Sequence, residues 1–196
     1  MNDFQGDRRP QERPHKPLRL RIPTPIDAIS AHHLIRASAF VDDNSPYLYL
    51  LVCSHFAQTS VVAEQDGEIL GLISAYIPPQ QADTLFVWQV VVAPSLRRCG
   101  LAHSMLNFIL QGAACQHVQY IDTTVTQDNE ASRALFTRLA TQLACPLRES
   151  LLFERTTHFQ NLHDSEYLLR IGPFDRKALR GEDASSHQAA PALTRR

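Results

Sequence analysis

One continuous stretch decides the fold: residues 87–110 read VWQVVVAPSLRRCGLAHSMLNFIL. It continues an apolar run that begins at Thr84, and its β-branched and aromatic residues predict a strand buried on both faces. Pro94 ends that strand, because proline cannot donate a hydrogen bond to the sheet. From Arg98 to about Ala114 the spacing predicts a helix, whose apolar stripe would be Ala102, Leu106, Ile109 and Ala113.

The turn between strand and helix reads Arg97-Arg98-Cys99-Gly100-Leu101-Ala102, the pattern R-x-x-G-x-A. The first backbone N–H groups of a helix have no partner inside the helix, and the helix dipole adds positive charge there. Gly100 lets a ligand approach the backbone closely, and the two arginines can pair with phosphate oxygens. The turn therefore predicts a pyrophosphate site. The alternative is an ordinary junction between a strand and a helix.

Strands and helices alternate on both sides of this stretch. Leu18–Ile22 alternates basic and apolar residues as a half-buried strand does, and Thr24-Pro25 opens a helix. That helix would place Ile26, Ile29, His33 and Leu34 on one face. A short helix is expected over 47–56, a helix starting at Asn129 with the stripe Ala131, Leu135 and Leu139, and strands over 60–64, 69–76, 84–92, 120–125, 151–153 and 166–171. The prediction is an α/β fold with a central mixed sheet of six or seven strands flanked by helices.

The chain has 196 residues and a formal net charge of −1, which suits one domain with tails and gives no case for binding nucleic acid or an anionic membrane. No apolar run approaches the roughly 18 residues of a membrane span, and the N-terminus lacks the apolar core of a secretory signal. The cysteines are Cys53, Cys99, Cys115 and Cys145, without ligand-like spacing. We expect reduced thiols, no metal and a cytoplasmic protein.

The two ends of the chain differ from its middle. Residues 1–17 are polar, proline-rich and arginine-rich, and residues 175–196 are charged and rich in alanine and serine, without a period. Both compositions predict disordered or flexible tails. The folded domain is therefore expected over 18–174.

The strand, turn and helix resemble the acetyl-CoA site of the GNAT acetyltransferase superfamily. The resemblance implies that Val90, Val91 and Val92 face the pantetheine or acetyl group and that residues Arg97, Arg98, Cys99, Gly100, Leu101 and Ala102 cradle the pyrophosphate. It makes Asn129 and Ser132 further cofactor contacts, although Asn129 could equally cap a helix and Ser132 face solvent. Many relatives carry a tyrosine that protonates the leaving thiolate where this chain has Phe136, so that role is missing or filled elsewhere.

Several longer strings resemble the diaminobutyrate acetyltransferases within that superfamily. They are residues 42–53 (DDNSPYLYLLVC), 74–79 (SAYIPP), 83–90 (DTLFVWQV), 122–126 (DTTVT) and 168–173 (LLRIGP). The resemblance covers about residues 18–173. It implies an acetyl-CoA-dependent transfer to the γ-amino group of L-2,4-diaminobutyrate, the first committed step toward the compatible solute ectoine in osmoadaptation, by a homodimer.

By the same resemblance, the substrate pocket would be lined by Asp42, Tyr47, Trp88, His163 and Glu166. Asp42 and Glu166 could pair with the ammonium groups, and the ring of Trp88 could face a cation. Each has an alternative: Asp42 could cap a helix, Trp88 could belong to the core, and His163 and Glu166 could be surface loop residues.

The attacking amine must lose a proton, since an alkyl ammonium group has a pKa of roughly 10. Glu166 or Asp42, through water if needed, is the expected proton acceptor, and backbone N–H groups near Val90 or Val91 would stabilise the charge on the thioester oxygen. We expect direct transfer in a ternary complex. Two rival functions are a GNAT enzyme for another amine, such as a peptide N-terminus, and a sensor that binds acyl-CoA without catalysis.

Overall fold

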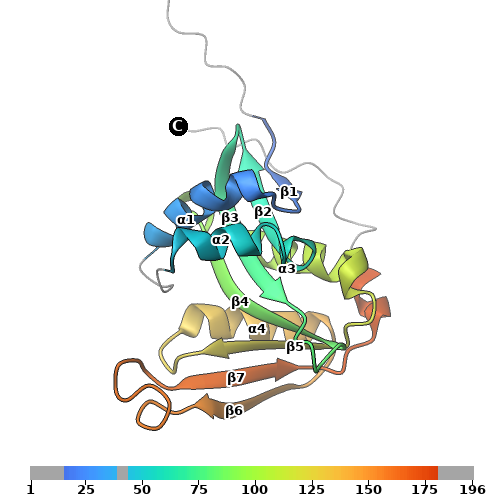
Figure 1. Ribbon diagram of the computed structural model, residues 1–196. Helices are drawn as coiled ribbons and strands as arrows, with labels where there is room; N and C mark the ends of the chain where they lie inside the picture. The colour runs from blue at the N-terminus through green and yellow to red at the C-terminus, as the bar shows by residue number, and fades with distance from the viewer. Residues whose placement is uncertain (1–15, 39–43, 181–196) are drawn as a thin grey trace, which may run out of the picture.

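The computed structural model describes residues 16–38 and 44–180. They form a seven-stranded mixed sheet in the order β1-β2-β3-β4-β5-β7-β6 (Figure 1). β4 and β5 are parallel, and every other neighbouring pair in this sheet is antiparallel. The strands are β1 (Arg19–Arg21), β2 (Val61–Gln65), β3 (Glu68–Tyr76), β4 (Thr84–Val92), β5 (Tyr120–Val125), β6 (Leu147–Phe153) and β7 (Glu166–Ile171). The predicted fold class is confirmed.

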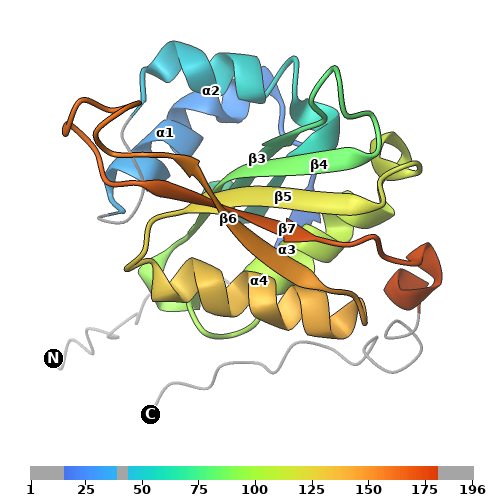
Figure 2. The same cartoon turned by 90° about the horizontal axis from the view of Figure 1, so that it is seen from below.

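Helices cover the two faces of the sheet as separate layers (Figure 2). One layer consists of α1 (Ala28–Arg36) and α2 (Pro46–Val52), and the other of α3 (Leu101–Gln111) and α4 (Glu130–Gln142). Each layer has its own core: Ile35 and Tyr49 pack on Leu72 and Val91, whereas α3 and α4 pack on a larger cluster that includes Val87. The sheet is therefore buried from both sides over its centre.

The buried face of α1 differs from the expected one. Ile26 is 91% exposed and Ile29 is 49% exposed, so the predicted stripe was wrong. The chain from Pro25 to Asp27 is a 3₁₀ turn, and the α-helical register begins only at Ala28. The residues that α1 buries are Ala28, Ala31, His32 and Ile35, whose small members let the helix lie close to the sheet.

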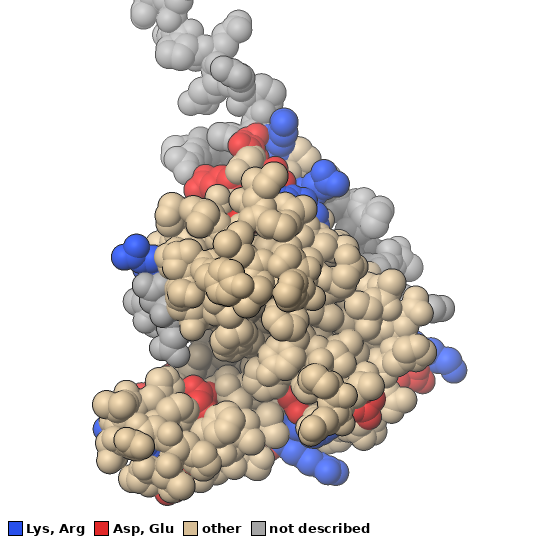
Figure 3. Space-filling model, viewed as in Figure 1, with Lys and Arg blue, Asp and Glu red and all other residues tan. Residues whose placement is uncertain are grey.

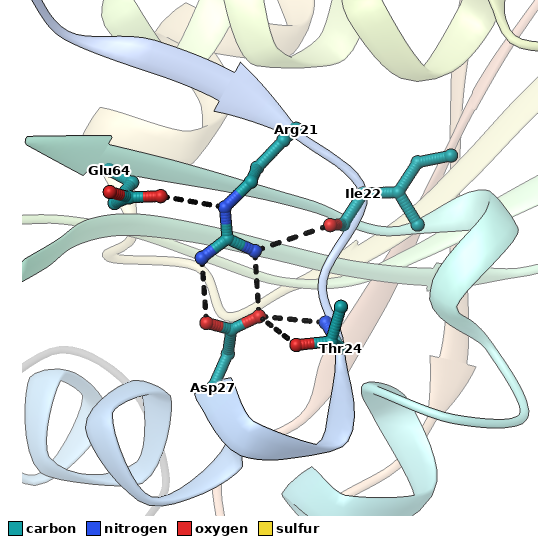
Figure 4. Close-up of polar contacts among 5 residues, drawn as sticks. All are labelled: Arg21, Ile22, Thr24, Asp27 and Glu64. Atoms are coloured by element: carbon teal, nitrogen blue, oxygen red, sulfur yellow. Dashed lines mark hydrogen bonds and ion pairs between the residues drawn. The ribbon is translucent and has the colours of Figure 1, made fainter. Parts of the chain in front are cut away.

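An ion-pair network fixes the first strand to the start of this layer (Figure 4). Both Nη atoms of Arg21 on β1 donate to the carboxylate of Asp27, each at 2.7 Å, and its Nε donates to Glu64 on β2 at 2.8 Å. The hydrogen bonds from Arg21 lower the pKa of Asp27, and backbone and hydroxyl donors of Thr24 act in the same direction. This clamp sets where α1 begins.

Two strands part at the centre of the sheet. β4 and β5 pair from Thr84 with Tyr120 as far as Val87 with Thr123, and the ladder ends there. The rest of β4 continues to Val92 and diverges from β5, so that the strands form a V (Figure 1). A parallel pair that opens in this way exposes backbone N–H and C=O groups of β4 along the gap.

The packed chain extends past residue 174. Residues Arg176–Arg180 form a 3₁₀ helix, Leu179 is buried, and Arg176 donates to the carbonyl oxygens of Cys115 and Leu110 at 2.6 and 2.8 Å. The expected tails otherwise fall mostly on residues 1–15 and 181–196, outside the described residues. Among the helices of the described chain, none is long and apolar enough to cross a bilayer.

Candidate active site

A β-bulge in β4 lies where the V opens. Ser74 pairs with Gln89, but the next residue of β3, Ala75, pairs with Val87, so Trp88 is an extra residue without a partner in the ladder. Just before the bulge, Phe86 contacts Tyr76, which in turn contacts Phe56 beyond the end of α2. Phe86 therefore lies on the sheet face that carries α1 and α2, which we call the site face. Trp88, two residues further along the strand, lies on the same face.

The side chain of Trp88 is 43% exposed. A ring of this size in the middle of a central strand would normally be largely buried. The core alternative for Trp88 is therefore wrong, and the prediction that β4 is buried on both faces fails at this residue. An indole face open at the tip of the V can receive a cation or an alkyl chain.

The turn after β4 has the geometry of an anion site. Arg98 and Gly100 adopt positive φ angles of 61° and 84°, and Gly100 is the N-cap of α3. The first bond of the helix runs from the N–H of Ser104 to the carbonyl of Gly100 at 3.0 Å. The N–H groups of Leu101, Ala102 and His103 precede that bond and point out of the helix N-terminus, where the dipole is positive.

The same turn is open enough to hold a pyrophosphate. Arg97, Arg98, Cys99 and Gly100 are all exposed. A Cβ built on Gly100 would meet no atom within 4 Å, so the space beside its backbone is accessible. Arg97 is fixed by a hydrogen bond from its Nε to the carbonyl of Val92 at 3.1 Å, and the thiol of Cys99 donates to the carbonyl of Leu96 at 2.8 Å. The residues present therefore fit the pyrophosphate of a coenzyme A molecule.

The remaining predicted cofactor residues differ in their surroundings. Val90 and Val92 are half-buried and line the diverging part of β4, whereas Val91 is 3% exposed and packs under α1, so its contact with a ligand would come from its backbone alone. Asn129 caps α4 by accepting a hydrogen bond from the N–H of Ser132 at 3.0 Å, and Ser132 is half-buried. Phe136 is 1% exposed and packs in the core under α3 and α4, and its ring carries no hydroxyl group to protonate a thiolate.

On the substrate side, the structure brings together His163 and Glu166. His163 Nε2 lies 4.0 Å from Glu166 Oε1, and the carbonyl of Asp164 accepts from His163 Nδ1 at 2.7 Å. The Glu166 side chain is 18% exposed at the start of β7, so it is not a freely solvated loop residue. Tyr47 is 67% exposed in the first turn of α2. Asp42 lies outside the described residues.

Glu166 shares the site face with residues of the neighbouring strands. Asp122 pairs with Phe86 on one side and with Arg170 on the other, and Arg170, Leu168 and Glu166 alternate along one side of β7. Figure 3 shows that the surface in this view is hollowed between the lobe formed by the β6–β7 connection and the body of the molecule, with acidic side chains along the hollow. The site is therefore an acidic hollow beside the V.

Asp122 and Arg170 were given no role from the sequence alone. Asp122 is 5% exposed in the middle of β5. The signal that could have revealed it is a carboxylate within a short strand whose other residues suit a buried sheet, because an aspartate is rarely buried without a partner. In the described part of the chain, no group of three histidine, cysteine or acidic residues is placed to hold a metal ion.

Comparisons with known proteins agree with this geometry. The model of the acetyltransferase (GNAT) family matches residues 29–140. The L-2,4-diaminobutyric acid acetyltransferase of Methylotuvimicrobium alcaliphilum is 41% identical, with 80% of this chain and 91% of that protein covered, and the enzyme of the same name from Bordetella parapertussis is 44% identical, with 79% and 84% covered.

Solved structures give the same picture. The diaminobutyrate acetyltransferase of Paenibacillus lautus, determined with L-2,4-diaminobutyric acid and coenzyme A, superposes with a TM-score of 0.78 at 39% identity, covering 81% of this chain and 96% of that one. Ard1 from Thermoplasma volcanium, at 15% identity and a TM-score of 0.63, shares the fold alone. The chain therefore belongs to the GNAT acetyltransferase family and, within it, to the L-2,4-diaminobutyric acid acetyltransferases.

Proposed function

We propose that this protein transfers the acetyl group of acetyl-CoA to the γ-amino group of L-2,4-diaminobutyrate and so forms N4-acetyl-L-2,4-diaminobutyrate for ectoine synthesis. The observation that carries the proposal is the position of Trp88: a half-exposed indole at the bulge where β4 leaves β5, on the same face as Glu166. The bulge lies in β4, the strand that would hold the thioester, and Trp88 at the bulge borders the acidic hollow that suits a diamino acid.

The cofactor side is proposed to follow β4 and the turn after it. The N-terminus of α3 and the arginines at 97 and 98 hold the pyrophosphate, and the backbone of residues 90–92 binds the pantetheine. Asn129 and Ser132, at the start of α4, are proposed to contact the same ligand from the other side of the V. Bound acetyl-CoA supplies an activated acetyl group at the tip of the V.

The substrate side offers carboxylates and an aromatic ring to two ammonium groups. Glu166 pairs with an ammonium group, His163 positions Glu166 and Tyr47 closes the hollow from α2, with Asp42 as a second ammonium partner from the segment that precedes α2. The ring of Trp88 faces the carbon chain and the γ-ammonium group. A site of this kind favours a small dication over a monoamine.

Chemistry at this site needs a proton acceptor and a donor for the thioester oxygen. Glu166 takes the γ-ammonium proton through water, with Asp42 as the alternative acceptor, and the neutral amine then attacks the thioester carbonyl. Backbone N–H groups of β4 near Val90 and Val91 stabilise the charge that develops on oxygen. Cys99 lies in the pyrophosphate turn, so we propose direct transfer in a ternary complex without an acetylated cysteine.

We also propose a cytoplasmic homodimer that acts on a small molecule, without nucleic acid or membrane partners. Support for the second copy comes from β6, which lies at the edge of the sheet and leaves Leu151, Leu152 and Phe153 between 36% and 52% exposed. Apolar residues on an edge strand are commonly covered by another chain. Four cysteines without a disulfide and the use of acetyl-CoA fit the cytoplasm.

The test compares L-2,4-diaminobutyrate with a peptide amine as acetyl acceptor. The rate of each reaction is measured as the release of the coenzyme A thiol. Rapid release with diaminobutyrate supports the proposal. Turnover of the peptide alone would favour the first rival, an enzyme for another amine. Tight binding of acetyl-CoA without turnover of any amine would favour the second, a sensor.

A further inference from the structure

Asp122 and Arg170 face one another on adjacent strands but are joined only loosely. Arg170 Nη1 lies 3.6 Å from Asp122 Oδ2, whereas a charge-assisted hydrogen bond is about 2.7–2.9 Å long. The same protein shows what a tight pair looks like, because both contacts between Arg21 and Asp27 measure 2.7 Å. The Asp122–Arg170 pair is therefore open to a third group.

The second oxygen of Asp122 is the stronger anomaly. Asp122 is 5% exposed, and its Oδ1 finds no hydrogen-bond partner among residues 16–38 and 44–180. Burial raises the pKa of this carboxyl group, Arg170 lowers it and Asp83 raises it. An aspartate held in this way is costly unless a donor reaches it during function.

Arg170 is held in place but keeps donors to spare. Its guanidinium lies over the ring of Tyr120 at 4.6 Å, and its Nη2 donates to Thr84 Oγ1 at 3.2 Å. The side chain is 36% exposed. A guanidinium carries five N–H donors in a flat fork, and stacking fixes the plane of that fork before a ligand arrives.

The strand register places Asp122 near Trp88, whereas the guanidinium of Arg170 lies at Thr84 and Tyr120, toward the closed end of the V. Asp122 pairs with Phe86, two residues before Trp88 and immediately before the β4–β5 ladder ends. With a rise of about 3.3 Å per residue and a strand spacing of about 4.8 Å, the Cα atoms of Asp122 and Trp88 are roughly 8 Å apart. The two nitrogens of diaminobutyrate are separated by three carbons, a length that suits this gap.

We propose that Asp122 and Arg170 bind the α-amino-acid head of the substrate, Asp122 receiving the α-ammonium group and Arg170 the α-carboxylate. The inference rests on the proposed function and deepens it. An α-ammonium group gives Asp122 Oδ1 the donor that it lacks, and an α-carboxylate occupies the donors of Arg170. The γ-nitrogen then points toward Trp88 and the V, within reach of Glu166 through water.

Two analogues of the substrate separate the two contacts. 1,3-Diaminopropane is diaminobutyrate without its carboxylate, and 4-aminobutyrate is diaminobutyrate without its α-amino group. If Arg170 binds the carboxylate, Arg170→Gln lowers kcat/KM for diaminobutyrate by about 10- to 100-fold and leaves that for 1,3-diaminopropane nearly unchanged. If Asp122 binds the α-ammonium group, Asp122→Asn has a similar effect on diaminobutyrate and almost none on 4-aminobutyrate.

The experiment measures thiol release from acetyl-CoA for the wild type and both variants with all three amines. Arg148→Gln is the matched control, because Arg148 is exposed and pairs with Arg170 across the β6–β7 ladder. This substitution removes one positive charge beside Arg170 and leaves Arg170 itself in place. It should change no ratio between amines. Arg170→Lys should restore part of the preference for diaminobutyrate, since a single ammonium replaces the fork.

Ratios between amines are insensitive to the fraction of folded enzyme, so partial unfolding of a variant cannot imitate the result. Equal losses on diaminobutyrate and on the matching analogue would overturn the inference and leave Asp122 and Arg170 as a pair that supports the sheet. If the wild type acetylates the peptide amine but not diaminobutyrate, the proposed function itself falls, and this assignment falls with it.

Discussion

Val87 and Val91 lie four residues apart on β4, yet they pack into opposite faces of the sheet. Val87 belongs to the core under α3 and α4, and Val91 to the core under α1. Strict alternation would put residues four apart on one face, so the strand slips by one residue between them. The slip is the bulge at Trp88, and it places an aromatic ring on the site face while β4 stays anchored in both cores.

Trp88→Ala should therefore impair catalysis more than stability. Loss of the ring face removes its contact with the substrate cation, and kcat/KM for diaminobutyrate should fall about 10-fold. Because the side chain is 43% exposed, the thermal midpoint should change little. Steady-state kinetics and thermal unfolding of the same preparation check both. A large drop in the thermal midpoint with unchanged kcat/KM would mean that Trp88 supports the fold and does not contact the substrate.

Glu166→Gln should reduce kcat/KM by about 10²- to 10⁴-fold, because it removes the proposed proton acceptor and an ammonium partner. Binding of acetyl-CoA, measured by calorimetry, should be unaffected. Glu154→Gln is the control, since Glu154 is an exposed carboxylate in the connection that leads from β6 to Glu166, and it accepts a hydrogen bond from Thr157. Comparable losses from the two variants would mean that only the total negative charge of this region matters and that Glu166 has no specific role.

Cys99 should report on the pyrophosphate site. It is the exposed thiol of the four cysteines, whereas burial raises the pKa of Cys53 and Cys115 to about 11 and keeps them unreactive. A maleimide at pH 7 should label Cys99 first and abolish acetyl-CoA binding, and saturating acetyl-CoA should slow the labelling. Cys99→Ser should bind acetyl-CoA normally and resist inactivation. If Cys99 is labelled at the same rate with and without acetyl-CoA, the pyrophosphate does not bind at this turn.

The clamp between Arg21 and Asp27 should matter for stability and depend on pH. Asp27→Asn breaks a largely buried ion pair and should lower the free energy of unfolding by about 3 kcal/mol at pH 7. The pKa of Asp27 is depressed in the folded state, so its contribution is present above the unfolded pKa of about 3.9 and is lost as pH falls through the folded value. Wild type and variant should therefore converge in acid.

Urea unfolding of both proteins from pH 7 downward measures this difference. Glu64→Gln is the comparison, because Glu64 accepts from the same guanidinium but at the surface, and its loss should be smaller. A gap between wild type and Asp27→Asn that stays constant into acid would show that the variant disturbs packing and that the ion pair contributes little.

The strands over 84–92 and 120–125 were predictable because local signals agree there. The predicted bounds of β4 and β5 match the structure, because each strand is a β-branched run with a clear end. Pro94 ends the first run and a polar turn ends the second.

The two helices α3 and α4 were located correctly, but their predicted stripes were partly wrong, because Ala113 and Ala131 are exposed whereas Met105, Leu110 and Phe136 are buried. The stripe of α1 was not predictable, because the 3₁₀ turn at Pro25 shifts the helical register and is itself set by the contact of Asp27 with Arg21. That contact joins residues on different elements.

The site divides in the same way. The turn of Arg97 to Ala102 is contiguous in sequence, so its chemistry could be predicted from its residues, and the roles of Trp88, His163 and Glu166 came from family resemblance. Asp122 and Arg170 meet only through the register of β5 and β7, and the exposure of Trp88 depends on a one-residue slip. Neither relationship leaves a local pattern in the sequence.

The most direct test of the central claim is the position of the acetyl group after turnover. Diaminobutyrate, ornithine, lysine and a peptide amine are each incubated with acetyl-CoA, thiol release is followed, and mass spectrometry locates the label. If the enzyme acts as proposed, release is fastest with diaminobutyrate and the acetyl group is found on its γ-nitrogen. Acetyl on the α-nitrogen, or faster turnover of the peptide amine, would contradict the proposed function.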